Sequence, residues 1–109
     1  MQLTLNGRNA LITGGSKGLG LAMALAFAKA GGNVALVARG TEALEAAKAE
    51  ILAAAPSAKV AAISADIRTL DGCNAAAKAA AEAIGPIDIL VNNAGTSQRG
   101  PFLDVAEEL

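Results

Sequence analysis

A glycine-rich segment near the start of the chain carries the strongest indication of chemistry. Residues 13–20 read Thr-Gly-Gly-Ser-Lys-Gly-Leu-Gly and lie between an apolar run of strand length and a segment with helical periodicity. A diphosphate can approach main-chain N–H groups closely only where side chains are missing, and the N–H groups at a helix N-terminus attract the anion. The segment therefore predicts a turn that binds the diphosphate of a nucleotide.

Two other interpretations of this segment compete with a diphosphate turn. The phosphate loop of nucleoside triphosphatases has the pattern Gly-x-x-x-x-Gly-Lys-Ser/Thr, and Gly15 and Gly20 have its glycine spacing. Leu21 and Ala22, however, occupy the positions of the lysine and the hydroxyl residue, which argues against a nucleoside triphosphatase. A glycine-rich turn without any ligand remains the alternative.

A second motif, Asn92-Asn93-Ala94-Gly95, follows the last apolar run of the chain. The first segment has the spacing Thr-Gly-x-x-x-Gly-x-Gly, which differs from the Gly-x-Gly-x-x-Gly of the ordinary dinucleotide fingerprint. Together, and in this order of elements, the two motifs resemble those of the short-chain dehydrogenase/reductase family. The resemblance covers the whole chain but only the first part of that family's domain. It implies a partial NAD(P)-binding Rossmann domain over residues 1–109.

The resemblance also implies the residues of a cofactor site. Asp66, followed by Ile67, matches the acidic position that hydrogen-bonds the adenine amino group, for which a carboxylate is a sound acceptor. Otherwise Asp66 is a solvated turn residue. Asn92 is similar to the asparagine that ties the central strands together. The other candidates are Gly14, Ser16, Lys17, Gly18, Leu19 and Gly20 at the diphosphate turn, and Asn93, Ala94 and Gly95 beside the ribose and nicotinamide.

Arg39 bears on which cofactor is bound. In a doubly wound domain the end of the second strand meets the adenosine ribose, where an acid accepts from a free 2′-hydroxyl and an arginine suits a 2′-phosphate. Ala38 stands where the acid would be, and Arg39 follows it. Because guanidinium offers paired donors in a planar fork, we expect NADP as the cofactor rather than NAD. The alternative is that Arg39 and Lys17 are ordinary surface charges.

Apolar runs and helical periods alternate along the chain between glycine and proline residues. We expect strands at 8–13, 33–38, 59–65 and 87–92, and helices at 19–30, 41–55 and 69–84. Thr41 is expected to cap the second helix, and Leu21 and Leu25 are expected to form an exposed apolar patch on the first. Parallel pairing with right-handed crossovers gives an α/β fold, a Rossmann-like doubly wound sheet in the order 3-2-1-4.

Composition narrows the setting and the partners. The 109 residues include 9 basic and 10 acidic side chains and no histidine, so no basic surface for nucleic acid or an anionic membrane is expected. With one cysteine, Cys73, we expect neither a metal cluster nor an internal disulfide, and a reducing, cytoplasmic location. Cys73 is expected to pack as a small apolar residue. No signal peptide or membrane span is expected.

The chain offers no candidate for the family's catalytic residues. In that family a tyrosine moves the proton, a lysine four residues on lowers its pKa and a serine orients the substrate carbonyl, whereas this sequence contains no tyrosine. Residues 104–109 resemble the start of another helix, so we expect a sheet truncated after its fourth strand. The chain alone is therefore expected to be inactive.

Two hypotheses of different class follow. In the first, the chain is the amino-terminal, cofactor-binding part of an NADP-dependent oxidoreductase that acts on a small carbonyl or alcohol substrate. Its full-length parent is then expected to be a homo-oligomer. In the second, it is a non-catalytic NAD(P)-binding module, such as a redox-sensing regulator or an inactive truncated product.

Overall fold

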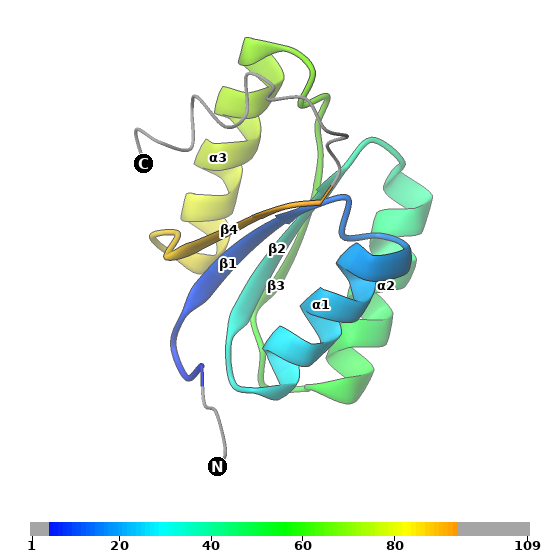
Figure 1. The fold of residues 1–109 in the computed structure, drawn as a ribbon, viewed down its shortest axis with the longest axis vertical. Coiled ribbons are helices and arrows are strands. Elements are labelled where there is room, and N and C mark those ends of the chain that lie inside the picture. Colours follow the sequence, from blue (N-terminus) through cyan, green and yellow to red (C-terminus); the bar gives the residue numbers. More distant parts are fainter. Residues whose placement is uncertain (1–4, 94–109) are drawn as a thin grey trace.

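The computed structural model describes residues 5–93, which form a four-stranded parallel sheet covered by helices on both faces (Figure 1). Neighbouring strands follow the order β3-β2-β1-β4, so the predicted order 3-2-1-4 is confirmed. The elements alternate along the chain as β1 (Asn9–Thr13), α1 (Gly18–Lys29), β2 (Asn33–Ala38), α2 (Thr41–Ala54), β3 (Val60–Ser64), α3 (Leu70–Ile84) and β4 (Ile89–Asn92).

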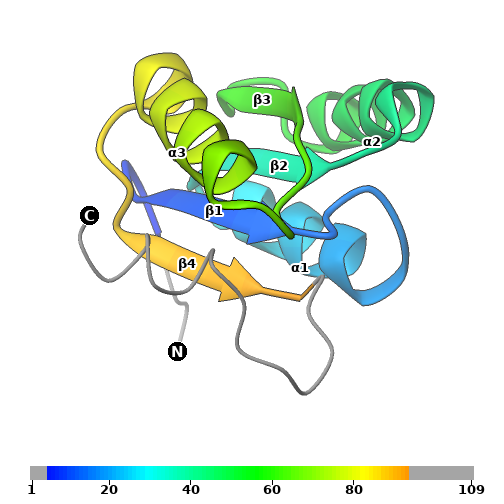
Figure 2. The ribbon, with the colours of Figure 1, turned by 90° about the horizontal axis from the view of Figure 1, so that it is seen from above.

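The core lies in two layers, one on each side of the sheet. Figure 1 shows α1 and α2 against one face and α3 against the other, and Figure 2 shows β4 at one edge of the sheet. Successive residues of a strand point to opposite faces, so Ile12 and Leu36 pack toward α1 and α2 while Leu11 and Val37 pack toward α3. Strands β1 and β2 are therefore apolar on both faces, which is typical of a covered parallel sheet.

The first helix packs differently from the expectation. Its buried residues are Gly20, Ala24 and Ala28, which are small enough for the helix axis to lie close to the sheet. Leu21 and Leu25 flank this face and are half-buried against the core, so the predicted exposed patch of these two leucines is wrong. Close approach of the helix brings the leucines within reach of the strands.

The predicted cap of the second helix is also wrong. Gly40 is the N-cap of α2, and Thr41 is the first helical residue, from which its hydroxyl makes no capping hydrogen bond. Thr69 does cap α3, because its extended main chain lets the side-chain oxygen accept from the Gly72 N–H at 3.0 Å. Strands β1, β3 and β4 are one or two residues shorter than predicted, with the bounds given above.

Side-chain amides tie the amino ends of the four strands together. Asn9, which is only 8% exposed, donates from Nδ2 to the carbonyl of Pro86 at 2.8 Å, and its Oδ1 accepts from Asn33 Nδ2 at 2.9 Å. The Oδ1 of Asn33 accepts in turn from the Lys59 N–H at 3.0 Å, while Asp88 Oδ2 accepts from the Asn9 N–H at 2.9 Å. One chain of hydrogen bonds thus crosses the amino edge of the sheet.

Replacement of Asn9 by alanine is expected to destabilise the fold by about 1 to 3 kcal/mol, because the Pro86 carbonyl and the Asn33 amide would lose their partner in a half-buried setting. Urea unfolding followed by circular dichroism measures the change. Asn74→Ala, at an exposed position of α3, is the matched control and should leave stability nearly unchanged. Equal midpoints for the two variants would show that the amide chain contributes little.

Candidate functional site

The predicted site residues gather at the carboxyl edge of the sheet. Chain order reverses between β1 and β4, since β2 and β3 extend from one side of β1 and β4 lies on the other. Open α/β sheets bind ligands at such a point, beyond the carboxyl ends of the strands. The described residues that follow the strands here include the glycine turn after β1, Arg39, Asp66, Ile67 and Asn93. Ala94 and Gly95 lie outside the described residues.

Glycine is required at two kinds of position in the turn after β1. Gly14 and Gly18 have φ values of 69° and 53°, in the left-handed region that glycine adopts without strain. Gly20 is buried in the first turn of α1, where a Cβ atom would overlap the carbonyl of Gly14 and lie 2.8 Å from Asn93 Nδ2. The missing side chain therefore lets the start of α1 pack directly on the end of β1.

The N-terminus of α1 fits an anion. No side-chain hydrogen bond caps this helix within the described residues, and its first turn contains no acidic residue. The first N–H groups of a helix have no intrahelical partner, and the helix dipole makes this end positive. Lys17 is the N-cap and its side chain is exposed, and a Cβ atom at Gly18 would meet nothing within 4 Å. Ser16 is half-buried and Leu19 is 68% exposed beside this open space.

Arg39 follows β2 and exposes its side chain at the same edge. Its carbonyl accepts from Ser64 Oγ at 2.9 Å, which ties the end of β2 to the end of β3. Within the described part of the chain, the guanidinium makes no hydrogen bond or ion pair. Ala38 ends β2 without a carboxylate. The Arg39 donors are thus available to an anionic group at the end of β2.

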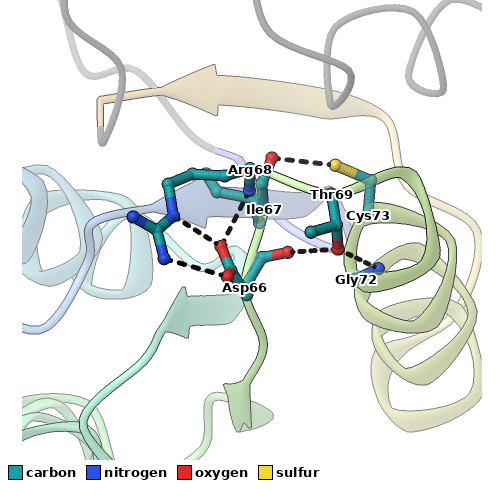
Figure 3. A network of polar contacts seen from close by, with 6 residues as sticks. All are labelled: Asp66, Ile67, Arg68, Thr69, Gly72 and Cys73. Carbon is teal, nitrogen blue, oxygen red and sulfur yellow. Dashed lines mark hydrogen bonds and ion pairs between the residues drawn. The ribbon is translucent and has the colours of Figure 1, made fainter.

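The carboxylate of Asp66 is held by an arginine that the sequence analysis did not single out (Figure 3). Arg68 donates from Nε to Oδ1 at 3.0 Å and from Nη2 to Oδ2 at 3.1 Å, and its main-chain N–H donates to Oδ1 at 3.0 Å. These bonds from Arg68 lower the pKa of Asp66 from 3.8 to about 2. The Asp-x-Arg spacing in the sequence could have indicated this pair, because an aspartate in a turn often accepts from the N–H two residues on.

The turn that carries Asp66 and Ile67 is anchored to the start of α3. Thr69 Oγ1 donates to the Asp66 carbonyl at 3.2 Å and accepts from the Gly72 N–H at 3.0 Å, and Cys73 Sγ donates to the Ile67 carbonyl at 3.1 Å. Cys73 is fully buried, which confirms that it packs in the core, and burial raises the pKa of its thiol. Figure 3 shows both carbonyls of the turn engaged from the helix side.

Strands β1 and β4 are joined by side chains where the order reverses. Thr13 Oγ1 lies 3.0 Å from Asn92 Oδ1, to which it donates, and Asn93 Nδ2 donates to the carbonyl of Gly14 at 3.5 Å. Asn92 thus ties β4 to β1 in the way that the resemblance implied. Asn93 contacts the glycine turn from the other side of the switch point.

A sequence profile described as short chain dehydrogenase matches residues 8–109. The chain belongs to the short-chain dehydrogenase/reductase family. It is 41% identical over 104 residues to the oxidoreductase UcpA of Salmonella typhimurium, and 38% identical over 99 residues to gluconate 5-dehydrogenase of Gluconobacter oxydans. The alignments cover 95% and 91% of this chain but 38% of each relative. The chain therefore spans little more than a third of the length of these two family members.

Solved structures of the family share the fold. An L-sorbose reductase of Gluconobacter frateurii in complex with NADPH and L-sorbose superimposes with a TM-score of 0.82 at 36% identity, over 99% of this chain and 41% of that one. An NADPH-bound short chain oxidoreductase of Pseudomonas aeruginosa gives 0.82 at 36% identity, over 88% and 37%.

Between residues 5 and 93, no acidic, histidine or cysteine side chains form a group that could hold a metal ion. Within the same range, every helix is too short or too polar to span a bilayer.

Replacement of Gly20 by alanine is expected to destabilise the fold and to weaken nucleotide binding, because the new Cβ would push α1 away from the Gly14 carbonyl. The cost should be about 1 to 3 kcal/mol in urea unfolding. Gly40→Ala is the control, since its Cβ would meet nothing within 4 Å and its main chain has a negative φ of −84°, which leaves only the smaller cost of alanine at an N-cap. A Gly20 variant as stable as the Gly40 variant would contradict the packing argument.

The Asp66 pair is expected to make stability depend on pH in the acid range. The pKa of this carboxyl falls from 3.8 to about 2 on folding, so its contribution is complete above about pH 4 and is lost as the pH falls toward 2. Arg68→Ala should flatten the dependence in thermal unfolding measured from about pH 2 to 6. The effect is small because both side chains are solvent-accessible. Arg8→Ala, at the opposite ends of the strands, should show the same dependence of stability on pH as the unchanged protein.

Proposed function

We propose that this chain is the cofactor-binding part of an NADP-dependent oxidoreductase that transfers hydride between a nicotinamide cofactor and a small carbonyl or alcohol substrate. The observation that carries the proposal is the uncapped N-terminus of α1 at the switch point, on the same edge as the exposed Arg39. The NADPH complexes of two similar structures support a nicotinamide cofactor.

Each part of the edge has a role in this proposal. The N–H groups of the first turn of α1, with Lys17, bind the diphosphate, and the glycines of the turn allow its close approach. Asp66 accepts from the adenine amino group, and Ile67 lies beside it in the same turn. The residues assigned to the ribose and nicotinamide are Asn93, Ala94 and Gly95. The bound cofactor supplies hydride transfer, and these residues bind and orient it.

The preference for NADP over NAD rests on the end of β2. An NAD site needs a carboxylate there to accept from the 2′-hydroxyl, and Ala38 cannot provide one. The guanidinium of Arg39 offers two parallel donors to a 2′-phosphate, and no internal carboxylate of the described residues binds it first. Pairing with Arg68 further reduces the repulsion that the charge of Asp66 would exert on a phosphate at this edge.

A non-catalytic NAD(P)-binding module is the second candidate. The described residues at this end of the sheet are assigned to binding and orienting a cofactor, which this function requires as much as the first does. Carbonyl-dependent oxidation of NADPH by the intact protein separates the two functions. The cytoplasmic location and the homo-oligomeric parent stay predictions from the sequence.

Replacement of Arg39 by alanine is expected to weaken NADPH binding by about tenfold to a hundredfold, because a charge-assisted hydrogen bond contributes about 1.5 to 3 kcal/mol. NADH binding should change little, since its ribose lacks the phosphate. Titration calorimetry with both cofactors measures the difference, and Arg8→Ala controls for the loss of one positive charge. Equal losses for NADPH and NADH would refute the assignment of Arg39 to the 2′-phosphate.

A further inference from the structure

We infer that Arg68 is a positioning residue that makes this site select adenine, because it holds the Asp66 carboxylate with one acceptor position of Oδ2 directed to the base. The inference rests on the proposed function and extends it to the choice of base. Arg68 itself contacts the carboxylate, and the base contacts Oδ2.

The hydrogen bonds of the pair leave the two carboxylate oxygens unequal. An ionised carboxylate has about four acceptor positions, two on each oxygen. Oδ1 accepts both from Arg68 Nε and from the Arg68 main-chain N–H, each at 3.0 Å, so its two positions are filled. Oδ2 accepts from Arg68 Nη2 at 3.1 Å, and within the described residues no second donor reaches it. One position of Oδ2 is therefore available to a ligand.

Arg68 also fixes the direction of that position. The two parallel bonds of the guanidinium fork set the plane of the carboxylate as well as its distance. The main chain of the turn is held independently, because Thr69 Oγ1 donates to the Asp66 carbonyl and Cys73 Sγ donates to the Ile67 carbonyl (Figure 3). The Arg68 main-chain N–H also restrains Oδ1, whatever side chain stands at position 68. The freedom that remains is rotation of the carboxylate about that bond, and the fork of Arg68 removes it.

A fixed carboxylate discriminates between bases. Adenine presents an amino donor where hypoxanthine presents a carbonyl acceptor, and an ionised Asp66 has no proton to offer that carbonyl. A site that holds its carboxylate against the hypoxanthine carbonyl rejects this base far better than a site whose carboxylate can turn aside. Without the fork, only the main-chain bond to Oδ1 restrains the carboxylate, so Oδ2 can turn away from a hypoxanthine carbonyl toward water at little cost. Selectivity for adenine should then fall while the site remains able to bind the rest of the cofactor.

The test compares NADPH with its deamino analogue, in which hypoxanthine replaces adenine. Affinities of the intact protein for both dinucleotides are measured by titration calorimetry. The unchanged protein should prefer NADPH by about tenfold or more, and Arg68→Ala should lower this preference by about three- to tenfold. Arg68→Lys keeps the charge without the fork, so it should lose the preference nearly as fully as the alanine variant. Asp66→Asn should also lose it, because an amide can donate to the hypoxanthine carbonyl.

Arg8→Ala removes the same side chain from the opposite edge of the sheet and should keep the preference of the unchanged protein. A preference for NADPH that survives in Arg68→Ala would overturn the inference. A preference that Arg68→Lys fully retains would also overturn it, because the charge of Arg68 would then suffice without its fork. If Arg68→Ala lost affinity for NADPH and for the deamino analogue in equal proportion, the inference would be overturned as well. These results leave the proposed function standing, whereas failure of the unchanged protein to bind either dinucleotide would reject both.

Discussion

The packing of Gly20 against the Gly14 carbonyl is the constraint on which the site depends. A side chain at Gly20 would separate the first turn of α1 from the end of β1 and so move the helix N-terminus away from the switch point. The same approach brings Leu21 and Leu25 against the core, so one contact serves both stability and the site. A helix end held this close to a strand end presents N–H groups in fixed positions, which favours binding of an anion without reorganisation.

The amino and carboxyl ends of the strands carry different polar groups. At the amino edge, Asn9 and Asn33 satisfy one another and the neighbouring main chain, which joins the strands and leaves few groups for a ligand. At the carboxyl edge, the strands are joined through Thr13 with Asn92 and through Ser64 with the Arg39 main chain, while the charged head of Arg39 remains exposed. Parallel strands place all carboxyl ends on one side of the sheet, which is the side where the proposed binding groups lie.

The turn after β3 holds a short-range ion pair at the place proposed for the adenine contact. Asp66 and Arg68 are two residues apart, and their ion pair at the surface adds little to stability. Its consequence is geometric, since Thr69 and Cys73 hold the main chain of the turn while the fork and the main-chain N–H of Arg68 orient the carboxylate. Prearranged acceptors lose less freedom on binding than mobile ones.

The sequence by itself determined the order of the elements, the sheet order, the family and the glycine turn. These depend on periodicity, on turn residues and on motif spacing, all of which act between near neighbours or follow from the rules of parallel pairing. The sequence also placed Arg39 directly after an apolar strand, and its side chain is exposed there, while its role toward a 2′-phosphate stays a prediction. The binding roles given to all the site residues stay predictions, and Ala94 and Gly95 also lie outside the described residues.

Only the tertiary structure decided which side chains meet. The amide chain through Asn9 joins residues that are 77 and 24 positions apart, and the burial of Leu25 depends on the small residues that α1 turns toward the sheet. The partner of Asp66 is close in sequence, but only the structure showed that its carboxylate bonds to Arg68. The Asp66 main chain is held there by Thr69 at the start of α3. Such contacts depend on the positions of strand ends in space, which local residue patterns do not encode.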